Sequence, residues 1–139
     1  MAMKTFGGSC HCGAVKFEAD IDLARGTLRC NCSLCRKARA WFAFTPPDHL
    51  RVLSGETAQT EYSWTPPNRP RPNIHYHFCV TCGVRTYARA DDDGHGNPMI
   101  AVSVAALDDA DLTELEGTIR YVDGLHDHFD RTPEHAEAL

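Results

Sequence analysis

Short stretches in which apolar and polar residues alternate run along the chain, and clusters of glycine, proline and aspartate separate them. In residues 15–19 (VKFEA) apolar side chains alternate with charged ones, which is the pattern of a strand with one buried face. Further strands are expected at 27–30, 41–44, 50–53, 61–64, 74–78, 84–90, 100–104 and 119–122. Residues 91–97 (DDDGHGN) predict a turn between two of them. Strands this short and this regularly spaced predict a mainly β domain.

Two short helical segments and one stiff loop are expected between these strands. Residues 33–39 form one helical segment, and residues 107–112 form the other, where Asp108 or Asp109 can cap the first turn. Residues 65–72 (TPPNRPRP) contain four prolines in eight positions, which excludes a central strand. This segment is predicted to be an extended loop, either a surface connection or a rim over a site.

Length and charge limit the kind of protein. The 139 residues fit one domain, with a core over about 7–127 and a loose tail at 131–139. No run of residues is apolar enough for a signal peptide or a membrane helix, so a cytoplasmic location is expected. The net charge of −5 disfavours a nucleic-acid partner and an anionic membrane, both of which favour basic surfaces.

The cysteines form three clusters with metal-ligand spacing: Cys10-x-Cys12, Cys30-x-Cys32-x-x-Cys35 and Cys79-x-x-Cys82. Because thiols stay reduced in the cytoplasm, these spacings indicate metal binding rather than disulfides. The first pair presents both sulfurs on one face of a strand, and the third cluster with its following Gly83 has the spacing of a zinc knuckle. Together these two clusters predict a closed four-cysteine zinc site that contributes to folding.

The central cluster, called the cysteine triad below, holds three sulfurs within six residues. Three thiolates leave one zinc position open, which is the mark of a catalytic zinc. A thiol that binds there is deprotonated near neutral pH and becomes a nucleophile. Spacing alone leaves alternatives open. A histidine can close the triad as a second structural site, the triad can serve redox chemistry, or the first cluster can share an ion with Cys30 and Cys32.

Three segments carry a resemblance to a known family: 8–15 (GSCHCGAV), 30–36 (CNCSLCR) and 77–83 (HFCVTCG). Weaker matches occur at 53–56, Tyr62, 102–108 and 123–124. With these residues the chain resembles the glutathione-dependent formaldehyde-activating enzyme family, which also includes centromere protein V. The chain departs from the family pattern at Asn31, where a histidine is common, and at 37–41, where a glycine is common.

The resemblance implies a grouping of the ligands and an activity. A structural zinc is held by Cys10, Cys12, Cys79 and Cys82, and a catalytic zinc by Cys30, Cys32 and Cys35. The implied fold consists of small, strongly coiled antiparallel sheets of the β-tent type. The implied activity is that of a carbon–sulfur lyase, which joins glutathione and formaldehyde into S-(hydroxymethyl)glutathione or breaks that bond.

Basic and aromatic residues near the triad are candidates for the substrate site. Glutathione carries two carboxylates, so its site is expected to contain arginine or lysine. The predicted contacts directly follow the triad, and two further candidates lie on the proline-rich loop: Arg36, Lys37 and Arg39, then Arg69 and Arg71. Trp41 and Phe42 are expected to pack in the core, with a wall beside the triad as the alternative.

The histidines are weaker candidates. His75 and His77 share one face of a predicted strand and are considered for a fourth ligand or a proton shuttle. His126 and His128 are expected to be exposed in an acidic turn, and His11 is expected to point away from the zinc.

The expected function is that of a zinc-dependent lyase acting on glutathione and formaldehyde or a related aldehyde. Two alternatives stay open: a zinc-stabilised protein-binding module without catalysis, and a lyase for a different thiol or aldehyde.

Overall fold

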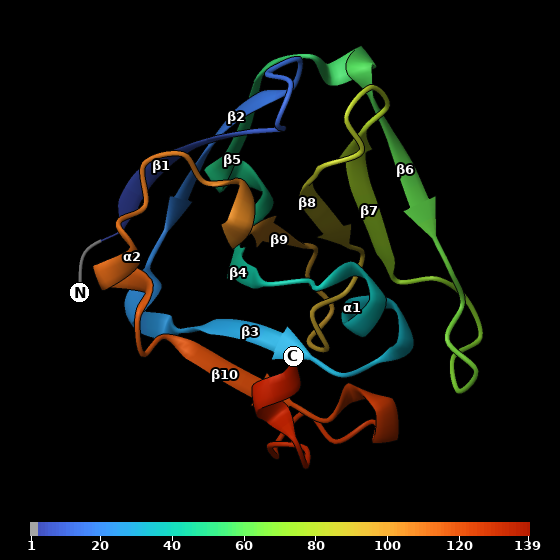
Figure 1. Cartoon of the computed structure of the whole chain (residues 1–139). Helices are drawn as coiled ribbons and strands as arrows, with labels where there is room; N and C mark the ends of the chain where they lie inside the picture. The colour runs from blue at the N-terminus through green and yellow to red at the C-terminus, as the bar shows by residue number, and fades with distance from the viewer. Residues whose placement is uncertain (1–2) are drawn as a thin grey trace.

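Residues 3–139 are described by a computed structural model and form two open β-sheets with two short α-helices (Figure 1). The smaller sheet has the order β1-β2-β5 and the larger one β10-β3-β4-β9-β8-β7-β6. The mainly β fold predicted from the sequence is therefore confirmed. The strands are β1 (Lys4–Ser9), β2 (Lys16–Ile21), β3 (Thr27–Cys30), β4 (Phe42–Thr45), β5 (Leu50–Ser54), β6 (Gln59–Ser63), β7 (Ile74–Cys79), β8 (Arg85–Ala90), β9 (Met99–Ser103) and β10 (Ile119–Val122); the helices are α1 (Ser33–Ala38) and α2 (Leu112–Leu115).

The larger sheet bends strongly along its width. Strands β6, β7 and β8 stand on one side of the molecule, whereas β3 and β10 cross its base (Figure 1). Neighbouring strands are antiparallel, as expected, except that β3 and β10 run parallel with Val122 opposite Cys30. This parallel pair brings the segment after β10 next to the segment after β3, which contains the rest of the triad.

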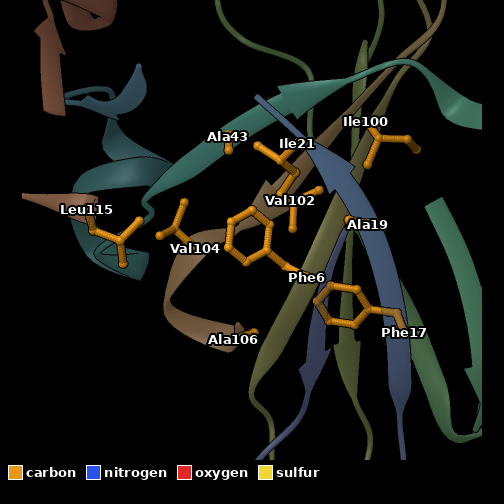
Figure 2. Close-up of a cluster of buried hydrophobic side chains, with 10 residues drawn as sticks. All are labelled: Phe6, Phe17, Ala19, Ile21, Ala43, Ile100, Val102, Val104, Ala106 and Leu115. Atoms are coloured by element: carbon orange, nitrogen blue, oxygen red, sulfur yellow. The ribbon is translucent and has the colours of Figure 1, made fainter. Parts of the chain in front are cut away.

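The main hydrophobic core lies between the two sheets (Figure 2). Phe6 of β1 and Phe17 and Ile21 of β2 pack in one cluster with Ile100 and Val102 of β9. Each of these side chains is at most 2% exposed. The alternation of buried and partly exposed residues along β2 thus produces the face that joins the sheets.

The opposite face of the larger sheet carries the triad. Successive residues of a strand point to opposite faces, so Ala43 joins the main core while its neighbour Phe42 packs with Cys30, Cys35 and Tyr76. The same alternation in β9 assigns Ala101 to the triad side. The candidate site therefore rests on a sheet whose other face is the core.

Strand β1 was not predicted, because Phe6 is the only large apolar residue in this segment. Gly8 is required in it, since an added Cβ would lie 2.2 Å from the ring of Phe17. The strand is also held by carboxylates: Asp109 accepts a hydrogen bond of 3.0 Å from the amide of Gly7.

The helix predicted at 107–112 is wrong in position. Helix α2 begins five residues later than expected, at Leu112. Its cap is Asp111, which with Glu114 forms a capping box. Asp108 caps no helix and instead accepts a hydrogen bond from the hydroxyl of Ser9 at 2.8 Å.

The remaining segments connect strands or end the chain. The proline-rich loop joins β6 to β7 without forming a strand, and residues 91–97 turn between β8 and β9. The segment 131–139, expected to be a loose tail, contains a 3-10 turn at Ala136–Ala138. Within residues 3–139, no helix is long and apolar enough to cross a membrane.

Candidate metal centres and active site

Four cysteines from two distant turns gather their sulfurs at one point. Cys10 and Cys12 lie in the turn between β1 and β2, and Cys79 and Cys82 lie in the turn between β7 and β8. All four Sγ atoms lie within 4.8 Å of one another. The site therefore joins a strand-connecting turn of the smaller sheet to one of the larger sheet.

The two turns have the same backbone construction. The amide of Cys10 donates to the carbonyl of Val15, and the amide of Cys79 donates to the carbonyl of Val84, five residues along in both cases. Each turn contains a glycine in the left-handed region, Gly13 with φ of 81° and Gly83 with φ of 75°. A turn of this kind directs two cysteine sulfurs and several backbone amides towards the same point.

The sulfur distances fit one zinc ion. Cys12 Sγ lies 3.7 Å from Cys10 Sγ and 3.6 Å from Cys79 Sγ. A tetrahedron with Zn–S bonds of about 2.3 Å has edges of about 3.8 Å. The amides of Cys12 and Val84 lower the pKa of the Cys82 thiol to about 6, so this ligand is readily available as a thiolate.

The cysteine triad lies at the junction of β3 and α1. Cys30 ends β3, Cys32 caps the N-terminus of α1, and Cys35 lies in the helix. Their Sγ atoms also lie within 4.8 Å of one another. The amides of Cys32 and Cys35 point at the sulfurs of Cys30 and Cys32, each at 3.4 Å. Within residues 3–139, no histidine or carboxylate joins this group, which therefore offers three ligands.

Hydrogen bonds inside the triad concentrate negative charge on Cys32. The thiols of Cys30 and Cys35, followed by backbone amides, lower the pKa of Cys32 to about 3. In return, hydrogen bonding to Cys32 raises the pKa of Cys30, and hydrogen bonding to Cys30 raises the pKa of Cys35, where burial adds to the effect. A soft cation fits this donor set, because it can replace the remaining thiol protons and balance three sulfurs at once.

Two aromatic side chains of the larger sheet pack against the triad. Phe42 and Tyr76 pack with the triad cysteines, and their ring centroids are 6.2 Å apart. Burial, followed by the charges of Cys35 and Cys32, raises the pKa of Tyr76. Its phenol therefore keeps its proton and remains a hydrogen-bond donor beside the sulfurs.

A narrow pocket beside the triad, without room for a water molecule in this structure, is rich in arginine. Its lining consists of Arg29, Cys30, Cys35, Arg36, Arg39, Ala40 and Leu139. Two predicted glutathione contacts, Arg36 and Arg39, thus lie beside the triad, and Arg29 joins them. The third, Lys37, is exposed and is not among the lining residues. Arg39 also donates to the carbonyl of Ala138 at 2.8 Å, which brings the C-terminal segment to the pocket.

Trp41 belongs to the main core rather than to the wall of the triad. It packs against the cluster between the sheets, and its Nε1 donates to the hydroxyl of Thr27 at 2.8 Å. The guanidinium of Arg29 lies 5.1 Å from the centre of the Trp41 ring, which holds this arginine in place.

The segment after β10 packs directly on the triad, which the sequence did not reveal. Asn31, between two triad cysteines, donates from Nδ2 to Asp123 Oδ1 at 2.9 Å and accepts from the amide of Leu125 at 2.9 Å. A Cβ added to Gly124 would lie 2.3 Å from Cys30 Sγ. Asp123 and Gly124 stood out in the sequence only as a weak match to the family, and the parallel pairing of β3 with β10 is what gives them this position.

The predicted histidine pair lies on the β6–β8 side of the larger sheet. His75 Nδ1 is 3.0 Å from Glu61 Oε2, and His77 Nε2 is 3.7 Å from Glu61 Oε1. Both side chains thus lie on one face, as expected, but neither joins the triad group. His75 Nε2 also contacts Asp91 at 2.9 Å. His11 is exposed.

The proline-rich loop contacts the segment that covers the triad. Arg69 forms a two-point ion pair with Asp127, with distances of 2.7 and 3.2 Å. Arg71, two residues on, is exposed. Arg69 therefore fixes the loop to the C-terminal segment, whereas Arg71 stays a predicted substrate contact together with the pocket arginines.

Comparison with known proteins assigns the family. Residues 5–122 match the sequence model of the glutathione-dependent formaldehyde-activating enzyme family. The chain belongs to this family. A similar solved structure is the crystal structure of a Rhodobacter sphaeroides protein, determined as a structural genomics target. It is 28% identical, with a TM-score of 0.66, and the match covers 84% of this chain and 99% of that chain. The resemblance found in the cysteine motifs is thus confirmed, and membership supports a glutathione-dependent formaldehyde-activating role.

Proposed function

We propose that this family member is a carbon–sulfur lyase with two zinc ions per chain, which joins glutathione to formaldehyde or a related aldehyde and reverses the reaction. The observation that carries the proposal is a triad of sulfurs with three ligands beside a pocket lined by arginines. The seven free cysteines require a reducing compartment, so we place the protein in the cytoplasm.

Each part of the site has a role in this proposal. Zinc held by Cys30, Cys32 and Cys35 supplies an open position that lowers the pKa of a thiol. The pocket arginines attract the carboxylates of glutathione and orient its thiol towards the triad. Phe42 and Tyr76 keep water from the inner side of the sulfurs.

The test compares exchange between formaldehyde and its glutathione adduct, measured by NMR, with and without protein. Wild-type protein is expected to accelerate exchange, and Cys32→Ser is expected to reduce it to the uncatalysed rate while the fold is retained. Ser33→Ala, an exposed change in the same helix, is the matched control and should keep full activity. Full activity in Cys32→Ser would remove the triad from the mechanism.

Zinc X-ray absorption tests the same proposal without kinetics. Added glutathione should increase the average sulfur coordination of the two ions, because its thiol occupies the open position of the triad. An unchanged sulfur count together with no acceleration of exchange would favour a zinc-stabilised binding module instead.

A further inference from the structure

The turn after β10 forms one wall of the triad. The backbone of Gly124 lies so close to Cys30 Sγ that an added Cβ would be 2.3 Å from the sulfur. The next residue, Leu125, donates its amide to the side chain of Asn31, which sits between Cys30 and Cys32. This turn is therefore fixed to the triad by a backbone contact and by a hydrogen bond.

A chain of hydrogen bonds runs from the triad loop to a histidine in this turn. Asn31 Nδ2 donates to Asp123 Oδ1 at 2.9 Å, and His126 Nδ1 lies 2.9 and 2.8 Å from the two Asp123 oxygens. The bond from Asn31, followed by that from His126, lowers the pKa of Asp123, so this buried group is a carboxylate. A carboxylate accepts hydrogen bonds, and His126 therefore directs its Nδ1–H at Asp123, which leaves Nε2 without a protein partner among the described residues.

The position of the ring suits exchange of protons with a bound substrate. The side chain of Asp123 is 11% exposed, whereas that of His126 is 65% exposed. The carboxylate of this pair is therefore buried, and its imidazole is accessible to a substrate. Gly124 and His126 belong to one 3-10 turn, which rises about 2 Å per residue, so the backbone of His126 lies about 4 Å along the turn from the residue that approaches Cys30. In residues 3–139 the hydrogen bonds of the ring are made at Nδ1.

Asp123 is the carboxylate that orients this ring, because the other charged groups nearby are paired elsewhere. Asp127 follows His126 directly but is paired with Arg69 through two hydrogen bonds. The other candidate histidine, His75, is engaged by Glu61 and Asp91 on the β6–β8 side. His128 lies in the same exposed turn and contacts Asp123 through its backbone.

We propose that His126 is the proton-transfer residue of the triad site, and that Asp123 and Asn31 are positioning residues for its ring. This inference rests on the lyase function proposed above. In the forward direction, Nε2 accepts the thiol proton as the sulfur forms its bond to the aldehyde carbon. The π electron pair of the carbonyl moves to oxygen, and the proton on Nε2 passes to that oxygen. The reverse reaction uses the same atoms in the opposite order, so no other reactant is required.

Variants of three residues in the turn test the role. His126→Gln is expected to lower kcat about 100-fold or more, the usual contribution of a general acid–base group, with KM for the thiol and zinc content unchanged. Added imidazole should restore part of the lost rate. The matched control His128→Gln changes a second exposed histidine of the same turn and should retain wild-type kcat.

Asp123→Asn tests the positioning role through a measurement that needs no catalysis. In wild-type protein, nitrogen-15 NMR should show His126 with its proton on Nδ1. In Asp123→Asn the ring should lose this single tautomer, and kcat should fall about tenfold or more with zinc content retained.

The outcomes separate this inference from the proposed function. The role of His126 is overturned if His126→Gln keeps wild-type kcat, or if its kcat falls together with its zinc content and imidazole does not restore it. In either case, loss of activity in Cys32→Ser still supports the lyase function. No acceleration by wild-type protein overturns both proposals.

Discussion

Gly124 lies with its backbone against the sulfur of Cys30, in the space that any side chain would enter. Gly124→Ala is expected to displace this sulfur and weaken the triad without touching the main core. Zinc per chain, measured by plasma emission spectrometry after dialysis, should therefore fall by about half while the circular dichroism spectrum is retained. Gly7→Ala is the control, because its added Cβ would meet Asp109 at an ordinary 3.5 Å. Full zinc content in Gly124→Ala would show that the turn can move away at no cost.

His75 gives the clearest pH dependence of stability at the residue scale. Its contact with Asp91, followed by that with Glu61, raises its pKa above the ordinary value near 6.5. The protonated ring therefore stabilises the folded state fully below its ordinary pKa, and this stabilisation is lost as the pH rises through the folded-state pKa of His75. His75→Gln should lower the melting temperature more at pH 5.5 than at pH 8.5. The corresponding difference in the free energy of unfolding should be about 1 kcal/mol or less for so exposed a cluster.

The control for this experiment is His95→Gln, an exposed change in the β8–β9 turn. It should shift the melting temperature equally little at both pH values. A larger effect of His75→Gln at pH 8.5 would mean that the neutral ring is the stabilising form.

At the scale of elements, the sequence indicated most strands and the cysteines of both groups, but only part of the wall around the triad. Alternation predicts strands because one face of each is buried, and cysteine spacing predicts ligands because a zinc ion accepts few geometries. Strand β1 was missed because Phe6 alone carries its apolar signal. His126 is exposed, as expected, but the contact of Asp123 with Asn31 was missed because it depends on the parallel register of Val122 with Cys30, a pairing of distant residues that no local pattern encodes.

The proline-rich loop is fixed to the C-terminal segment by the ion pair between Arg69 and Asp127. Arg69→Ala should release both segments, so hydrogen exchange should become faster at 65–72 and at 124–128. The change in overall stability should stay below about 1 kcal/mol, because both side chains are well exposed. Arg71→Ala removes a charge of the same loop and should leave exchange unchanged. Equal exchange in both variants would show that the prolines alone order the loop.

At the scale of the whole molecule, the two cysteine groups differ in what they connect. The four-cysteine group joins the β1–β2 turn of the smaller sheet to the β7–β8 turn of the larger one, whereas the triad joins β3 to the helix that follows it directly. A structural zinc is worth about 10–16 kcal/mol in small zinc domains, which is as large as the whole stability of an ordinary domain at about 5–15 kcal/mol. Loss of zinc from the four-cysteine group should therefore unfold the protein, whereas loss of zinc from the triad should not.

Cys12→Ser and Cys32→Ser make this comparison with the same chemical change. Cys12 is exposed, so its substitution leaves no cavity and acts through the metal alone. Cys12→Ser is expected to bind less zinc and to be largely unfolded at 37 °C, because the link between the sheets is lost. Cys32→Ser should melt within a few degrees of wild type while losing the zinc of the triad. Thermal unfolding followed by circular dichroism, with zinc measured in the same samples, checks both. If Cys32→Ser unfolds and Cys12→Ser melts like wild type, then the structural and catalytic assignments of the two groups must be exchanged.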